Sequence, residues 1–209
     1  MPLRGCLPHL DRRVRDRPRR PGCLRHHVEP DAVATGGRRL HPGRGGRPLR
    51  PAPHTPSTAL KRQPRTHVYL DAGNSGWIPE AWRLVDALRA SGVARADGVA
   101  LNVSNFQTNK ASSAYGDQLS KYLAGKHYVI DTSRNGNGPY SGTDAWCNPP
   151  GRALGTPPTT RTDNPLLDAY LWIKRPGESD GTCRGGPAAG QWWPSYALEL
   201  ARNAGNSGP

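Results

Sequence analysis

The chain has 209 residues, and its formal net charge of +13 at pH 7 is concentrated at one end. Residues 1–66 hold 16 Lys and Arg against 4 Asp and Glu, whereas residues 67–209 hold 13 against 12. No apolar run approaches the about 20 residues that a transmembrane helix needs, and the charges in residues 1–20 do not fit the apolar stretch of a secretory signal peptide.

Residues 1–59 form a low-complexity segment rich in Arg, Pro and Gly, without any Phe, Trp or Tyr. Such a segment buries too little apolar area to offset the loss of chain entropy. Three interpretations are open: a disordered arm, a nucleic-acid-binding arm, or a frame-shifted translation of a GC-rich gene. No aromatic residues alternate with the arginines for base stacking, and residues 1–66 contain one Lys against fifteen Arg. We therefore expect a disordered or frame-shifted segment and no nucleic-acid partner.

The remainder, residues 60–209, has the composition of one folded domain. Four short apolar runs predict strands, at residues 67–71, 98–103, 127–131 and 167–173. Helical spacing of apolar residues predicts three helices, at residues 78–90, 112–123 and 191–203. By their positions in these elements, Trp82 and Trp172 are predicted to lie in the core. Strands that alternate with helices are typical of an α/β fold with a parallel sheet.

Every predicted strand is followed by polar residues: Asp71, Asn105, Asp131 and the stretch 174–180. The carboxyl ends of parallel strands meet at one edge of a sheet, so these side chains are expected to face one cleft. An Asp in this position is also common as a turn former.

Carboxylates, amides and two Trp outside the predicted core, Trp77 and Trp146, suit a carbohydrate ligand. Sugar hydroxyls bind the polar groups, and the C–H faces of the sugar stack on indole rings. The sequence has no Ser-His-Asp arrangement with a nucleophile elbow and no phosphate-binding glycine motif.

None of the four cysteines is spaced as CxxC, so we expect no zinc site and no other metal. Spacing alone leaves two possibilities for Cys147 and Cys183. They form one disulfide of an exported protein, or they are two free buried thiols.

Five motifs follow one another in the second part of the chain: YLDAGNSGW (69–77), LNVSN (101–105), DTSRNG (131–136), WCN (146–148) and WIKRPGESDGTC (172–183). Together they resemble glycoside hydrolase family 6, whose endoglucanases and cellobiohydrolases act on β-1,4-glucan. The resemblance covers residues 60–203, roughly the second half of a family catalytic domain, and VEPDAVA (28–34) also resembles a family strand.

The resemblance implies a distorted, incomplete parallel β/α barrel and hydrolysis with inversion. Asp180 matches the family's proposed base, and Asp71 matches an aspartate near the reacting sugar. Arg134 matches an arginine that keeps the base ionised. Sugar-binding positions are matched by Trp77, Asn105, Trp146, Lys174, Glu178 and Asn74, although Asn74 stands where many members have His. Cys147 and Cys183 match a disulfide pair.

The resemblance further implies a secreted monomer that binds β-1,4-glucan, with no cofactor and no membrane partner. The segment 183–191 is short, which favours an open cleft and endo cleavage. The family's general acid is expected in an upstream Tyr-Asp-Leu-Pro motif, which this sequence lacks; Asp11, Asp16 and Asp31 do not match it. General acid catalysis contributes about 10²–10⁴-fold, so we expect an impaired hydrolase. The alternative is a non-catalytic glucan-binding remnant.

Overall fold

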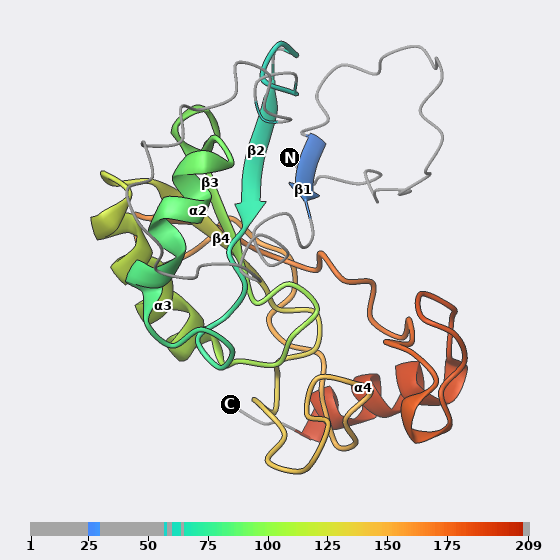
Figure 1. The fold of residues 1–209 in the computed structure, drawn as a ribbon. Helices are drawn as coiled ribbons and strands as arrows, with labels where there is room; N and C mark the ends of the chain where they lie inside the picture. Colours follow the sequence, from blue (N-terminus) through green and yellow to red (C-terminus); the bar gives the residue numbers. More distant parts are fainter. Residues whose placement is uncertain (1–24, 30–56, 58–59, 64, 207–209) are drawn as a thin grey trace.

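The computed structural model describes residues 25–29, 57, 60–63 and 65–206 (Figure 1). The expectations for the rest of residues 1–59, including Cys6 and Cys23, lie outside this part of the chain. Among the described residues, no helix has both the length and the apolar character needed to cross a bilayer.

The described strands form one parallel sheet in the order β1-β2-β3-β4-β5. Their bounds are β1 Arg25–Glu29, β2 Thr66–Asp71, β3 Gly98–Leu101, β4 His127–Asp131 and β5 Leu167–Leu171. Strand β1 lies within the segment expected to be without structure, and it pairs with β2 from Arg25 opposite Thr66 to Glu29 opposite Leu70. The other four strands confirm the predicted α/β pattern, and the sheet does not close into a barrel within the described residues.

In the part of the chain that the structure describes, three α-helices and three short 3₁₀ turns connect or follow the strands. Their bounds are η2 Ala81–Leu84, α2 Val85–Ala90, η3 Val93–Arg95, α3 Asn109–Tyr122, η4 Cys183–Gly185 and α4 Pro194–Asn206. Helix α3 begins three residues before its predicted start, because the Thr108 hydroxyl accepts the main-chain N–H of Ala111 (3.2 Å) and caps it.

The helix predicted at residues 78–90 begins only at Ala81, because Glu80 is extended (φ −85°, ψ 97°). The residues that face the sheet are then Ala81, Leu84, Val85 and Leu88, at helical spacing. Trp82 falls on the opposite side and is 58 % exposed, so its predicted core position is wrong. Trp172 is half-buried and donates its indole N–H to the Thr156 carbonyl (3.0 Å).

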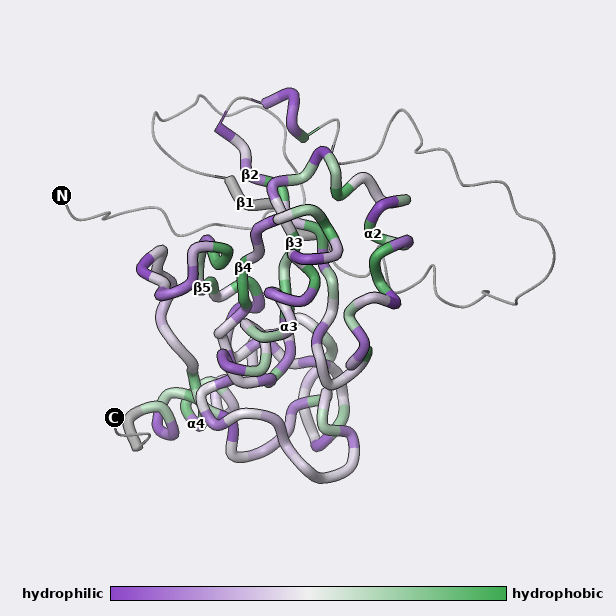
Figure 2. Tube along the Cα trace, turned by 90° about the vertical axis from the view of Figure 1, so that its left-hand side faces the viewer, coloured by the Kyte–Doolittle hydropathy of each residue, from purple (hydrophilic) through white to green (hydrophobic). Residues whose placement is uncertain are grey.

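Helices α2 and α3 cover one face of the sheet (Figure 1). The main apolar core lies between these helices and the sheet. The centre of this core consists of fully buried side chains: Leu70, Leu88, Leu101, Leu119 and Ile130. Figure 2 shows the apolar strands running through the middle of the molecule, with polar loops around them. The loops after β4 and β5, together with α4, lie beyond the carboxyl ends of the strands.

The other face of the sheet carries a smaller cluster of Tyr69, Ala100, Val129 and Ala169. The Tyr69 hydroxyl reaches across to Asp168 of β5 and donates to its carboxylate (2.6 Å). Gly98 of β3 makes this possible: a Cβ there would lie 3.2 Å from the Tyr69 ring and 2.0 Å from the His127 carbonyl oxygen.

We expect Gly98→Ala to lower the free energy of unfolding by about 1–3 kcal/mol, because the new methyl group forces β3 away from β4. Urea unfolding followed by circular dichroism measures the change. Gly125→Ala is the comparison, since nothing lies within 4 Å of a Cβ at Gly125 and only its positive φ opposes the substitution. Equal losses in the two variants would contradict this role of Gly98.

Candidate functional site

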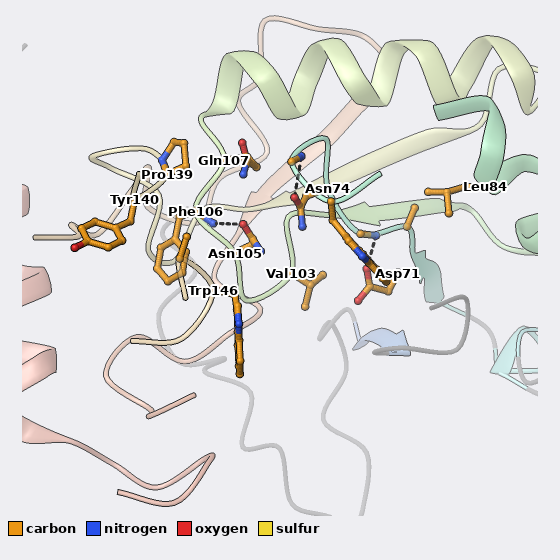
Figure 3. A pocket seen from close by; sticks show the side chains of 15 residues that line it. Asp71, Asn74, Leu84, Val103, Asn105, Phe106, Gln107, Pro139, Tyr140 and Trp146 are labelled. Atoms are coloured by element: carbon orange, nitrogen blue, oxygen red, sulfur yellow. Dashed lines mark hydrogen bonds between the residues drawn. The ribbon is translucent and has the colours of Figure 1, made fainter. Parts of the chain in front are cut away.

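A groove of about 700 Å³ lies at the carboxyl ends of β2 and β3 (Figure 3). Five of the predicted site residues line it: Asp71, Asn74, Trp77, Asn105 and Trp146. Among the described residues that line the groove, Asp71 is the only carboxylate. The expected convergence of strand ends is therefore present for β2, β3 and the long loop after β4.

The turn after β2 presents the first indole ring. The Asp71 carboxylate accepts the main-chain N–H of Gly73 (2.8 Å), and the Asn74 side chain accepts that of Gly76 (3.0 Å). Gly73 has a φ of 65°, and a Cβ there would lie only 3.1 Å from the Trp77 ring. The indole of Trp77 therefore lies over the Gly73 backbone and stays 55 % exposed.

The turn after β3 is held by Asn102, which is fully buried and has a φ of 62°. Its side-chain amide donates to the Asp131 carbonyl (2.8 Å) and accepts from Gln107 N–H (2.9 Å). This closed turn places Asn105 and Phe106 at the groove. Asn102 adopts the left-handed conformation that Asn tolerates better than most residues.

A buried carboxylate joins the ends of three strands. Asp131 accepts main-chain N–H groups from Ser104 (2.9 Å), Ser133 (2.9 Å) and Lys174 (3.0 Å). Burial raises the pKa of Asp131, and these donors act in the opposite direction. Sequence reasoning placed Asp131 at a strand end but did not predict that it organises the loops after β3, β4 and β5.

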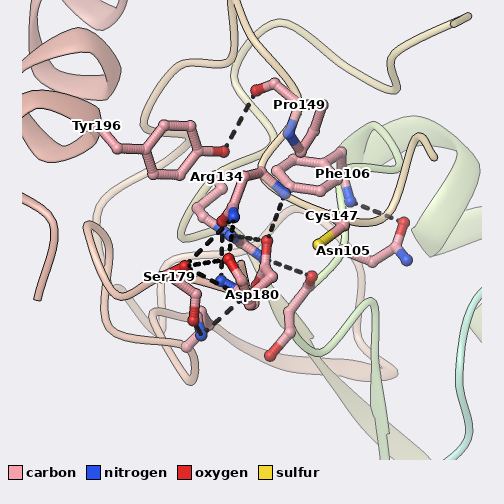
Figure 4. A network of polar contacts seen from close by, with 12 residues as sticks. Asn105, Phe106, Arg134, Cys147, Pro149, Ser179, Asp180 and Tyr196 are labelled. Carbon is pink, nitrogen blue, oxygen red and sulfur yellow. Dashed lines mark hydrogen bonds and ion pairs between the residues drawn. The ribbon is translucent and has the colours of Figure 1, made fainter. Parts of the chain in front are cut away.

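Asp180 lies in a second cluster beside the groove (Figure 4). One carboxylate oxygen, Oδ2, contacts Arg134 Nη1 at 2.7 Å, and the other, Oδ1, lies 3.5 Å from Lys174 Nζ. The Asp180 side chain is 9 % exposed and that of Arg134 is fully buried. Two cations thus balance the charge of a nearly buried carboxylate.

Arg134 also links Asp180 to the groove. Its Nη2 donates to the Ser104 carbonyl (2.6 Å), and its guanidinium lies over the ring of Phe106, 4.5 Å from the centroid. Phe106 in turn lines the groove. From α4, Tyr196 packs nearby; burial raises the pKa of Tyr196 to about 12, and its hydroxyl donates to the Pro149 carbonyl (3.4 Å).

Sequence reasoning gave no role to Asn148, which fixes the loop that carries Asp180. Its N–H donates to Asp180 Oδ2 (3.0 Å), and its Oδ1 accepts the Asp180 N–H (2.8 Å). Its side-chain amide also donates to the Gly181 carbonyl (2.8 Å). Asn148 stands in the WCN motif, directly after Cys147. These hydrogen bonds are one reason for an Asn at this position. Its φ of 44° is a second, because Asn tolerates the left-handed conformation.

Cys147 and Cys183 form a disulfide across 36 residues, which decides between the two possibilities that spacing left open. The bond joins the loop of Trp146 to the loop of Asp180. Glu178 does not line the groove; it pairs with Arg175 at the start of the second loop. Within the described part of the chain, no three His, Cys, Asp or Glu side chains come together in a way that could hold a metal ion.

A family model described as glycosyl hydrolases family 6 matches residues 28–204. The chain belongs to this family. The match includes the VEPDAVA segment as well as the motifs between residues 69 and 183.

Family 6 enzymes of known sequence and structure resemble about two thirds of the chain. Endoglucanase A of Cellulomonas fimi is 56% identical over 137 residues, which are 66% of this chain and 30% of the relative. Endoglucanase-6B of Humicola insolens is 34% identical over 167 residues, covering 66% of this chain and 48% of the relative. The chain thus spans less than half of these curated family 6 relatives.

A solved structure resembles the fold closely. It is the endoglucanase Cel6 from Mycobacterium tuberculosis in complex with methyl-cellobiosyl-4-deoxy-4-thio-β-D-cellobioside. The TM-score is 0.69 at 54% sequence identity, and the match covers 71% of this chain and 51% of the other. The expected family and fold class are therefore confirmed, and the sheet formed by the described residues is open.

Proposed function

We propose that the groove binds β-1,4-glucan and that the chain hydrolyses its glucosidic bonds with inversion, as a glucanase. One observation carries this proposal: Trp77 and Trp146 are 55 % and 62 % exposed on a groove beside the buried Asp180–Arg134 pair. Exposed indoles are costly in water and match the flat faces of glucosyl units. Relatives named endoglucanases support the reaction class.

In the proposed mechanism, Asp180 acts as the base. Its Oδ2 is held by Arg134 and by the Asn148 N–H, whereas its Oδ1 has only the longer 3.5 Å contact to Lys174 among the ion pairs. We therefore assign Oδ1 as the atom that takes the proton from the attacking water. Asp71 supports the reacting sugar from the end of β2, and Arg134 is a positioning residue. Asn74, Asn105, Lys174 and Glu178 are proposed to bind sugar hydroxyls.

The second carboxyl group that inversion needs, about 6.5–9.5 Å from the base, is not assigned. The Tyr-Asp-Leu-Pro motif is missing from the sequence. We propose that hydrolysis is slow for this reason. Asp31 does not match that motif, but it follows the last residue of β1 by two positions in the sequence. It is therefore the first residue to test as a source of residual activity.

Two finer features complete the proposal. Endo cleavage is supported by the short segment after Cys183, which folds back through hydrogen bonds from Gly190 N–H to the Ser179 carbonyl (2.9 Å) and from Ser179 N–H to the Gln191 carbonyl (2.8 Å). Such a segment leaves little chain to roof the groove.

Secretion is supported by the Cys147–Cys183 disulfide, since disulfides persist in oxidising compartments. We expect a monomer in solution.

The test is hydrolysis of carboxymethylcellulose and of cellohexaose by the purified chain. We expect the α-anomer as the first product by proton NMR, a faster fall in viscosity than in an exo-acting digestion, and rates about 10²–10⁴-fold below those of a complete relative.

The β-anomer as first product would contradict inversion, and rates equal to those of the Cellulomonas fimi endoglucanase would contradict the impairment. A loss of the residual activity in Asp31→Asn would support Asp31 as its source. Binding without hydrolysis would favour the glucan-binding remnant.

A further inference from the structure

A third exposed indole lies outside the groove, at the entry to α4. Trp192 is 60 % exposed and does not line the groove. A short antiparallel contact holds its backbone: Trp192 bridges to Glu178, and the Trp193 N–H donates to the Gly177 carbonyl (2.8 Å). The segment that presents Trp192 is thus fixed to the loop that carries Asp180.

The pairing decides where the side chains point. Residues opposite each other in an antiparallel bridge project to the same side, with Cβ atoms about 4.5–5.5 Å apart. The Trp192 indole and the Glu178 carboxylate therefore share one side. The observed position of the Trp192 ring requires glycine at position 177, because a Cβ there would lie 2.6 Å from the ring. The ring lies over the Gly177 backbone, as the ring of Trp77 lies over Gly73.

The charged groups beside the ring complete a set that suits a sugar. Glu178 pairs with Arg175, and Arg175 is more than half exposed. A carboxylate accepts hydrogen bonds from hydroxyl groups, a guanidinium donates to hydroxyl oxygens, and an indole stacks on C–H faces. The pair has no net charge, and the carboxylate disfavours a phosphate-bearing ligand.

We propose that Trp192, Glu178 and Arg175 form a separate subsite that binds one glucosyl unit of the glucan at the outer side of the Asp180 loop. This inference rests on the proposed function, since it extends the same substrate beyond the groove. Glu178 lies two residues before Asp180, so the proposed subsite is on the same loop as the proposed base. Trp82 is similarly exposed, but the Arg83 guanidinium lies over its ring, 5.7 Å from the centroid. One face of its ring is thus already occupied and Trp82 does not line the groove, so it serves as the matched control.

The test is NMR of the chain with ¹⁵N-labelled tryptophan, titrated with thio-linked cello-oligosaccharides of four and six glucosyl units, which resist hydrolysis. Indole signals are assigned with single Trp→Phe variants. We expect the signal of Trp192 to shift together with those of Trp77 and Trp146. By calorimetry, Trp192→Ala should weaken binding of the six-unit ligand about fivefold, which is a moderate loss for one stacking contact. Trp192→Tyr should restore most of it, and Trp82→Ala should change nothing.

The outcomes separate the two proposals. If Trp77 and Trp146 respond but Trp192 does not, and Trp192→Ala binds normally, the subsite is wrong and the proposed function stands. If no indole responds to either ligand, both are wrong. Weaker binding in both Trp192→Ala and Trp192→Tyr, with an altered near-ultraviolet circular dichroism spectrum, would assign Trp192 to the fold and overturn the subsite. If Arg175→Gln and Glu178→Gln leave the Trp192 shift unchanged, the charged pair has no part in it.

Discussion

Replacement of Asp180 by Asn is expected to lower the turnover of cellohexaose about 10²–10⁴-fold, the usual contribution of a proton acceptor. The amide keeps the shape of the side chain but cannot take the proton from water. The dissociation constant of a thio-linked cello-oligosaccharide should stay within about threefold of its original value, because the lost interaction acts in the transition state.

Reducing-end release and isothermal calorimetry measure the two quantities. Asp86→Asn is the matched control, since Asp86 is a fully exposed carboxylate of α2 and does not line the groove. Unchanged turnover in Asp180→Asn would remove Asp180 as the base. A parallel loss of turnover and binding would instead mean that Asp180 holds the glucan and that the chain is a binding protein.

The second large effect is expected on stability, from Arg134→Met. This change leaves the nearly buried Asp180 carboxylate with one of its two ion-pair partners, Lys174 at 3.5 Å, and the hydrogen bond from the Asn148 N–H. Breaking a buried ion pair by removing one partner costs about 3–5 kcal/mol. The same change removes the hydrogen bond to the Ser104 carbonyl and the stacking on Phe106. The free energy of unfolding from urea titrations should therefore fall by an amount in this range.

A double-mutant cycle tests the cause. The double variant with Asp180→Asn removes the buried carboxylate charge that has lost Arg134 and should recover part of the lost stability. Arg83→Met is the control, because the Arg83–Glu80 pair at 3.6 Å is exposed and such pairs contribute about 0–1 kcal/mol. Additive losses for Arg134 and Asp180 would show that their pairing does not stabilise the fold.

Strands β2 to β5 were predictable because local pattern and burial agree there, whereas β1 lies in the segment that was expected to be without structure. Strand β4 begins and ends at the predicted residues, 127 and 131. The start of the helix near residue 80 was not predictable from local pattern. The Ile78 carbonyl accepts a hydrogen bond from the Tyr115 hydroxyl (2.8 Å), which is a contact between distant segments. The misplacement of Trp82 follows from the 3₁₀ turn at Ala81–Leu84, because a turn of three residues rotates the apolar face relative to that of an α-helix.

For the site, the residue types were readable from motifs but the contacts were not. Arg134 and Asp180 are separated by 46 residues, and nothing local indicates their 2.7 Å contact. The contacts of Asn148 could not be predicted for the same reason, because its partners lie 32 to 35 residues away. The bridge between Glu178 and Trp192 depends on how one loop folds back. Such pairings are set by the three-dimensional path of the loops.

The Cys147–Cys183 bond has a mechanical consequence. Trp146 precedes one cysteine directly, and Asp180 lies three residues before the other, so a sulfur bridge and a few peptide units connect the stacking ring to the carboxylate. A displacement of the Trp146 ring is transmitted to the Asp180 loop along covalent bonds. We therefore expect the spacing between the two groups to vary less than the position of either one relative to the sheet.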